Sequence, residues 1–142
     1  MEPLKHEQDI VAPTAYQSDW ELLRLKTRSF DPVSVWSRVG GDMEFLRELV
    51  ALFTEEASQM LASIEAAVKA GNAADLNKFS HKLRGAVLQF SASRAAAIAG
   101  KLEEMGRTDS LQGASSVLND LKAETSELMD ALKLMVHPGA TQ

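Results

Sequence analysis

The sequence predicts an all-α protein, an up-down antiparallel four-helix bundle with an additional short N-terminal helix. Residues 33–137 contain no proline, and Ala, Leu, Glu, Lys and Met, all good helix formers, dominate this stretch. Apolar residues recur there at helical spacing in four long segments, which glycines and capping residues separate. Because the connections are short, helices that are neighbours in sequence should run antiparallel.

Capping signals place the short helix and the first long helix. The short helix should begin at Asp31, with Pro32 at its first position, where the missing N–H costs nothing, and stop at Gly40–Gly41. Asp42 should cap the long helix, and Gly71 should end it in a left-handed conformation. An i, i+3, i+4, i+7 stripe marks its buried face: Leu46, Leu49, Val50, Phe53, Ala57, Met60, Leu61, Ile64 and Val68.

Two shorter helices should follow. Asn72 can cap the first, over 73–90. Ser91 or Ser93 can cap the second, over 93–106, which is rich in small Ala residues that allow close packing.

The last helix should open at Asp109 or Ser110 and close at His137-Pro138-Gly139. Its apolar stripe alternates by three and four residues without a break: Leu111, Ala114, Leu118, Leu121, Thr125, Leu128, Leu132 and Met135. This stripe and that of the first long helix are predicted to be core.

The length of 142 residues is close to one domain. We expect the bundle to span 30–137 and a C-terminal tail to cover 138–142. The first fifteen residues are polar and contain two prolines, so we expect residues 1–29 to form a flexible tail, in which 18–28 could form a short helix packed on the domain or a linker segment.

Composition excludes several classes of function. Fifteen Lys and Arg against twenty Asp and Glu give a net charge of −5, without the broad cationic face that nucleic acid requires. The absence of cysteine excludes disulfides, cysteine–zinc sites and thiol catalysis. No apolar run approaches the roughly 20 residues of a membrane span, and the first ten residues lack the apolar core of a secretion signal. We therefore expect a cytoplasmic protein.

The segment 73–90 carries the candidate chemistry. With His81 at zero on a helical wheel of about 100° per residue, the large apolar side chains gather on the opposite side: Leu76, Phe79, Leu83, Val87 and Phe90. His81 should therefore point away from the core, into solvent. Its neighbours on the outer face are Ala74, Asn77, Lys78, Arg84, Gly85 and Leu88.

Two features of this face indicate an anion site. Gly85 lies one turn after His81, and a glycine inside a helix costs roughly 1 kcal/mol relative to alanine, without gain unless something must approach closely. Lys78, Lys82 and Arg84 surround the imidazole in an acidic chain. A phosphoryl group fits both, because the missing side chain leaves room and the cations offset its charge. A neutral ring nitrogen is a nucleophile, and its phosphoramidate is reactive enough to pass the group on.

These residues resemble a known family. The string HKLRGAVLQFSA at 81–92 is similar to the signature H-x-L-K-G-x-x-x-x-x-G-A of the histidine-phosphotransfer (HPt) domain. GGDMEFLRELVALF at 40–53, AGNAADL at 70–76 and KLEE at 101–104 also resemble that family. The resemblance covers about residues 30–135 and implies the same four-helix layout.

The resemblance implies roles for four residues. His81 would be the phosphoacceptor, through the ring nitrogen remote from the backbone, and Gly85 would give access to it. Arg84 would replace the usual lysine that helps to hold the phosphoryl group. Gln89 would orient or hydrogen-bond the site.

Three residues depart from the family pattern without removing an essential group. Arg84 keeps the charge of lysine but changes the donor geometry. Ser80 replaces the usual alanine before the histidine. Ser91 stands where glycine is common, so the end of this helix could differ.

The resemblance also implies a relay. In such a relay a response-regulator receiver domain, such as that of a hybrid histidine kinase, would carry the phosphoryl group on an aspartate, His81 would accept it, and the aspartate of another receiver would take it. The receiver would bring Mg²⁺ and an acidic pocket, so we assign no cofactor or metal to this chain. No phosphate-binding loop or kinase motif occurs in the sequence, and we expect a monomer.

Other titratable groups suggest no second site. His6 and His137 lie in the tails, and no two of the three histidines share i, i+4 spacing, which argues against a metal site. The paired acids Glu55-Glu56 and Glu103-Glu104 fall on polar helix faces, without signs of acid–base work.

Several outer-face residues could contact a partner. Lys78 and Lys82 could bind it or simply form a solvated helix face. Leu88 is predicted to join an apolar docking rim beside the histidine, although it could pack against the N-terminal helix. Phe45 and Leu52 lie about 100° off the main stripe of their helix. They could cover the short helix 31–39, which we favour, or join the partner surface.

Two other functions remain open. A chemotaxis-type kinase has a phosphoacceptor domain with the same H-x-x-K/R-G pattern, which a separate ATP-binding domain phosphorylates. A non-catalytic helical adaptor would bind a receiver or kinase without using His81. A histidine-kinase dimerisation helix fits less well, because it normally carries a proline soon after the histidine.

Overall fold

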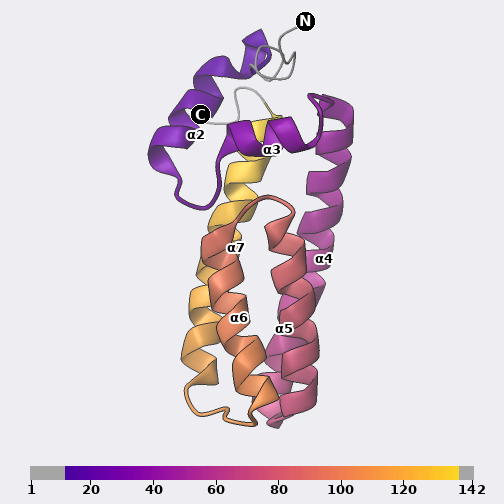
Figure 1. Ribbon diagram of the computed structural model, residues 1–142, viewed down its shortest axis with the longest axis vertical. Helices are drawn as coiled ribbons and strands as arrows, with labels where there is room; N and C mark the ends of the chain where they lie inside the picture. Colours follow the sequence, from indigo (N-terminus) through magenta and orange to yellow (C-terminus); the bar gives the residue numbers. More distant parts are fainter. Residues whose placement is uncertain (1–11, 138–142) are drawn as a thin grey trace, which may run out of the picture.

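The computed structural model describes residues 12–137. Within that range the chain is helical and contains no strand. In chain order the elements are the 3-10 helix η1 (Thr14–Tyr16) and the α-helices α2 (Gln17–Lys26), α3 (Pro32–Arg38), α4 (Met43–Ala70), α5 (Ala73–Leu88), α6 (Ser93–Arg107) and α7 (Ala114–Val136). Figure 1 shows the four long helices side by side, with α2 and α3 across one end.

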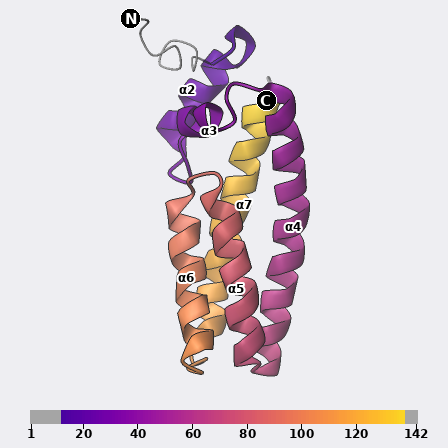
Figure 2. The same ribbon diagram turned by 45° about the vertical axis from the view of Figure 1, so that its right-hand side comes forward.

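The four long helices form the antiparallel bundle that the sequence predicts. Helix α4 packs against α5 and α7, and α6 packs against the same two helices, so that α4 and α6 are diagonal partners. Figure 2 shows the alternating directions of the four helices. Buried side chains from all of them meet in one core, which includes Leu46, Ile64, Leu83, Leu102, Leu121 and Leu132.

The predicted caps of α3, α4 and α5 are confirmed. The carboxylate of Asp42 accepts a hydrogen bond from the N–H of Phe45 at 3.0 Å. The side chain of Asn72 accepts one from the N–H of Asp75 at the same distance. Gly71 ends α4 with φ +66°, a left-handed conformation that glycine adopts without strain.

The two remaining cap predictions were wrong. Neither Ser91 nor Ser93 caps α6, because the N-cap is Ala92, without a side-chain hydrogen bond. Ser91 instead ends α5 in the left-handed conformation, with φ +57°, as a glycine would. The N–H of Ala92 then donates to the carbonyl of Val87 at 3.2 Å, which closes a Schellman-type turn.

Helix α7 also begins later than the sequence predicts. Asp109 and Ser110 belong to the end of α6: Asp109 has φ +52°, and the N–H of Ser110 donates to the carbonyl of Met105. Helix α7 begins at Ala114, after Gly113 with φ +83°. It ends at Val136, with His137 as the C-cap; residues 138–142 lie outside the described part.

Residues 12–29 are packed on the bundle, so the short helix considered for 18–28 is present and the expectation of a flexible tail is wrong for this part of the chain. Trp20 of α2 is 2% exposed, and its indole N–H donates to the carbonyl of Met135 at 2.8 Å. Its ring contacts Trp36 of α3 edge-on, at 5.2 Å between centroids. Helix α2 starts at Gln17, one residue before the expected segment 18–28. Residues 1–11 lie outside the described part.

Phe45 and Leu52, which we favour as a cover for α3, are not buried by it. Both side chains are about half exposed on α4, at 48% and 54%.

None of the helices within residues 12–137 combines the length and hydropathy that a membrane span needs.

Candidate functional site

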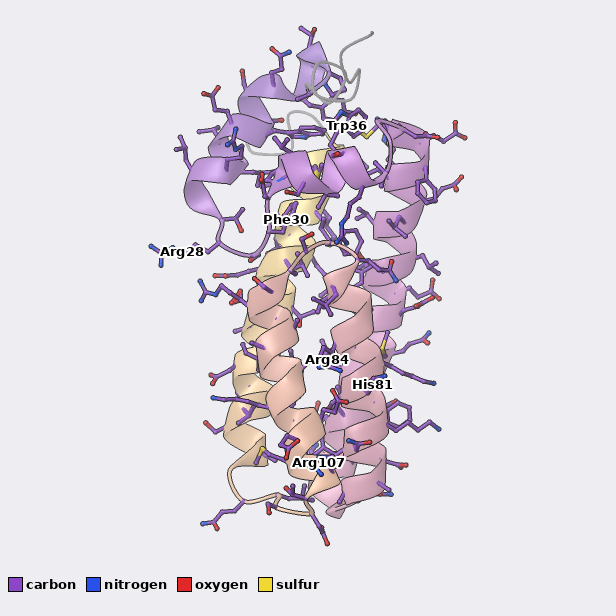
Figure 3. All side chains as sticks on the ribbon, viewed as in Figure 1. Arg28, Phe30, Trp36, His81, Arg84 and Arg107 are labelled. Carbon is purple, nitrogen blue, oxygen red and sulfur yellow. The ribbon has the colours of Figure 1, made fainter. Side chains whose placement is uncertain are left out.

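His81 lies on the outer face of α5, as the helical wheel predicts. Its side chain is 64% exposed, whereas Leu76, Leu83 and Val87 on the opposite face are fully buried. Phe79, which we placed with the core, is only partly buried. Figure 3 shows His81 and Arg84 on neighbouring turns of α5.

One ring nitrogen of His81 is engaged by a carboxylate from the next helix. Nδ1 lies 2.8 Å from Oε2 of Glu103 on α6. A carboxylate can only accept, so this contact selects the tautomer in which Nδ1 carries the proton and donates it. The lone pair then resides on Nε2, the nitrogen remote from the backbone.

Close packing of α5 and α6 brings Glu103 within reach of His81. Gly106 of α6 is buried against α5, so closely that an added Cβ would lie 2.5 Å from the backbone N of Asn77. The side-chain amide of Asn77 also donates to the carbonyl of Glu103 at 2.9 Å. At Gly100 an added Cβ would lie 3.7 Å from the side chain of Arg84. Gly106 thus allows an approach that a larger residue would prevent, whereas a side chain at Gly100 would make only an ordinary contact.

Arg84 shares the same carboxylate. Its Nε lies 3.0 Å from Oε1 of Glu103, an ion-pair contact that lacks the alignment of a hydrogen bond. The Glu103 side chain is 21% exposed and the Arg84 side chain 42% exposed. His81, Arg84 and Glu103 therefore form one cluster, in which the guanidinium is held beside the imidazole.

Gly85 leaves open space next to the imidazole. An added Cβ at this position would have no heavy atom within 4 Å beyond its own helix. An open groove of about 660 Å³ begins here and runs between α5 and α4; Lys82, Gly85 and Gln89 line it on one side, and Glu56 and Gln59 on the other. A group approaching His81 from solvent would meet no side chain over Gly85.

The other candidates lie around this centre without direct contact to the imidazole. Lys78 and Lys82 are exposed, and their Nζ atoms lie 5.2 Å and 5.9 Å from the ring centre of Phe79, a cation–π arrangement. Gln89 is exposed just past the end of α5, two turns from His81, and Leu88 is 45% exposed. The functions predicted for these four residues stay predictions.

Glu103 is the site residue that the sequence reasoning missed. The sequence predicts an ordinary acid on a polar helix face at this position. A signal was present, because Gly100 and Gly106 lie three residues to either side and so share a helix face with Glu103. A glycine-lined face in a bundle indicates close approach of a neighbouring helix, so that a carboxylate on it must find a partner there.

The described residues contain no group of three or more His, Asp or Glu side chains that could hold a metal ion. The side chains of the cluster can instead hold an anion near the free Nε2, since Arg84 is adjacent and two lysines lie on the same face.

Comparison with known proteins identifies the family. No curated protein and no solved structure gives a significant match to the chain. The family model of the Hpt domain matches residues 48–133, a range that contains α5, α6 and nearly all of α7. Because this match covers more than half of the sequence, the chain belongs to the Hpt-domain family.

Proposed function

We propose that the protein is a histidine phosphotransfer protein, which relays a phosphoryl group between the aspartates of receiver domains in a two-component phosphorelay. The observation that carries this proposal is the state of the His81 ring. Nδ1 is tied to Glu103 at 2.8 Å, while the rest of the ring is exposed beside the open space at Gly85. Nε2 is therefore the nucleophile, and its path to an incoming phosphoryl group is clear.

No proton leaves the imidazole ring during the transfer. The Nε2 lone pair attacks the phosphorus of the aspartyl phosphate, the N–P bond forms, and the P–O bond breaks to release the aspartate as a carboxylate. Nδ1 keeps its proton, so the product ring carries a positive charge. The carboxylate of Glu103 stabilises this charge, because its oxygen already accepts from Nδ1. In the reverse step the same protonated ring is a good leaving group.

Arg84 supports the step by electrostatics. Its Nε faces Glu103, which holds the guanidinium next to the imidazole. The remaining guanidinium N–H groups can donate to the oxygens of a phosphoryl group on Nε2. Lys78 and Lys82 add positive charge on the same face, and Gln89 and Leu88 belong to the surface on which a receiver docks. Mg²⁺ in the acidic pocket of the receiver would neutralise the phosphoryl oxygens on the partner's side.

Two further properties complete the proposal. Each bundle carries one exposed histidine in its phosphoacceptor cluster, so a monomer is sufficient for transfer. We propose that the protein acts in the cytoplasm, where it exchanges phosphoryl groups with its receivers.

A labelling experiment tests the proposal. The protein is incubated with phosphorylated receiver domains of its source organism and Mg²⁺, and acid-labile label on it is measured. His81→Gln should abolish the label, whereas His137→Gln, a matched change of an exposed histidine at the far end of α7, should not. Equal labelling of the His81→Gln variant would refute the site.

The same assay separates the alternatives. A chemotaxis-type phosphoacceptor domain would be labelled by ATP and a separate kinase domain but by no receiver. An adaptor would bind receivers without becoming labelled itself, and this binding would survive His81→Ala.

A further inference from the structure

A side chain from α3 caps the C-terminal end of α5. Nη1 of Arg38 donates hydrogen bonds to the carbonyl oxygens of Leu88 at 2.9 Å and of Gln89 at 3.1 Å. These bonds connect residues 50 and 51 positions apart in the sequence. Figure 1 shows α3 lying across the end of the bundle where α5 turns into α6.

This end of α5 needs a cation from elsewhere. The last carbonyls of a helix lack partners within the helix and carry the negative end of its dipole. No basic residue occurs in the last turn of α5. The turn that follows is also strained, because Ser91 adopts φ +57°, a conformation that residues other than glycine rarely take. Arg38 thus supplies the positive charge at a turn that the local sequence holds weakly.

The position of Arg38 is itself fixed by aromatic packing. It is the last residue of α3, two residues after Trp36, whose side chain is 4% exposed. Trp36 contacts Trp20, and Trp20 is hydrogen-bonded to the carbonyl of Met135 near the end of α7. Residues 12–42 therefore tie the end of the bundle to the turn after α5. All of them precede residue 48, where the match to the Hpt domain begins.

We propose that Arg38 is a positioning residue, which sets the affinity for receiver domains by holding Leu88 and Gln89 in place. This inference rests on the proposed function. Leu88 is 45% exposed and Gln89 lines the groove beside Gly85, so both can meet a docked partner. His81 lies two helical turns from the clamped carbonyls, and its own contact is with Glu103. Arg38 should therefore affect docking and leave the chemistry at His81 unchanged.

The test compares Arg38→Met and Arg38→Lys with Arg107→Met, a control that removes an exposed arginine at the opposite end of the bundle (Figure 3). Four quantities are measured on each full-length variant. They are KM and kcat for transfer from a phosphorylated receiver, the labelling of His81 by the small donor phosphoramidate, and hydrogen exchange of the amides of residues 90–92.

We expect Arg38→Met to raise KM about fivefold, with kcat within about twofold of wild type. Labelling by phosphoramidate should not change, because that donor needs no docking surface. Exchange at residues 90–92 should accelerate, since their N–H groups bond to Val87 and Leu88 in the turn that Arg38 closes. Arg38→Lys should raise KM less than Arg38→Met does, because an ammonium can still donate to the carbonyls. Arg107→Met should have the KM of wild type.

Two results would overturn the inference while leaving the proposed function intact. One is an unchanged KM for Arg38→Met with normal labelling by the receiver. The other is a raised KM with unchanged exchange at residues 90–92, which would mean that Arg38 contacts the receiver directly. Failure of the wild-type protein to be labelled by any receiver would instead refute the proposed function, and this inference with it.

Discussion

Substitution by alanine should have opposite effects on the free energy of unfolding at two glycines on adjacent helices. Gly85 lies inside α5 on the exposed face, where an added Cβ meets nothing within 4 Å. Alanine is favoured over glycine in a helix interior by about 1 kcal/mol, so Gly85→Ala should raise the free energy of unfolding by about that amount. Gly106 is buried, and an added Cβ would lie 2.5 Å from the N of Asn77 and 2.7 Å from the carbonyl oxygen of Ala73.

The magnitude at Gly106 follows from this overlap. Ordinary contact begins at 3.4 Å, so the two helices must separate by about 0.9 Å at a point where both contacts are with rigid backbone. Overpacking of this kind costs about 3 kcal/mol, at the upper end of the usual range. After the gain in helix propensity, Gly106→Ala should lower the free energy of unfolding by about 2 kcal/mol. The two variants should therefore differ by about 3 kcal/mol.

Urea unfolding followed by circular dichroism measures both values, with wild type as reference. Phosphotransfer assays on the same variants add a functional readout, because separation of the helices moves Glu103 away from His81. Gly106→Ala should therefore slow the labelling of His81. Gly85→Glu should remain folded and yet block transfer, through bulk and like-charge repulsion of the phosphoryl group. A destabilised Gly85→Ala variant, or a Gly106→Ala variant as stable as wild type, would show that we have misjudged how α5 and α6 pack.

Three further substitutions test the core, the turn and the site. Leu83→Ala removes a fully buried side chain and should cost about 2–5 kcal/mol in urea unfolding; a cost under about 1 kcal/mol would contradict its place in the core. Ser91→Gly relieves a left-handed conformation and should raise the free energy of unfolding by about 0.5–1 kcal/mol, and a loss of stability would argue against φ +57° at this residue. Glu103→Gln keeps the shape but removes the charge next to Nδ1, so labelling of His81 should slow about tenfold, equivalent to about 1.4 kcal/mol. An unchanged rate for Glu103→Gln would remove this carboxylate from the mechanism.

Most of the fold could be predicted from local sequence signals. The apolar stripes fix which face of each helix is buried, because the period of an α-helix is the same wherever it occurs. The side chains of Asp31, Asp42 and Asn72 bond to N–H groups two or three residues away, so they cap their helices without help from distant residues. The outward direction of His81 has the same origin, since it depends only on the angle between His81 and the apolar residues of its own helix.

The wrong predictions concern the caps of α6 and α7, where backbone conformation decides which helix a residue in the turn belongs to. Ser91 and Asp109 both have side chains suited to capping the next helix, yet both end the preceding helix in the left-handed conformation. A propensity for capping does not say on which side of a turn a residue will act. In both cases the deciding hydrogen bonds run from the N–H of the following residue back to the preceding helix.

The sequence by itself determined an all-helical bundle with an exposed histidine on a basic face, because both depend on periodicity within single helices. Only the tertiary structure decided which groups surround that histidine and its helix. Glu103 reaches His81 because α5 and α6 pack closely at Gly106, and Arg38 reaches the end of α5 because two tryptophans hold α3 across the bundle. Both contacts depend on the distance and rotation between helices, which many side chains set together and no short segment of the sequence encodes.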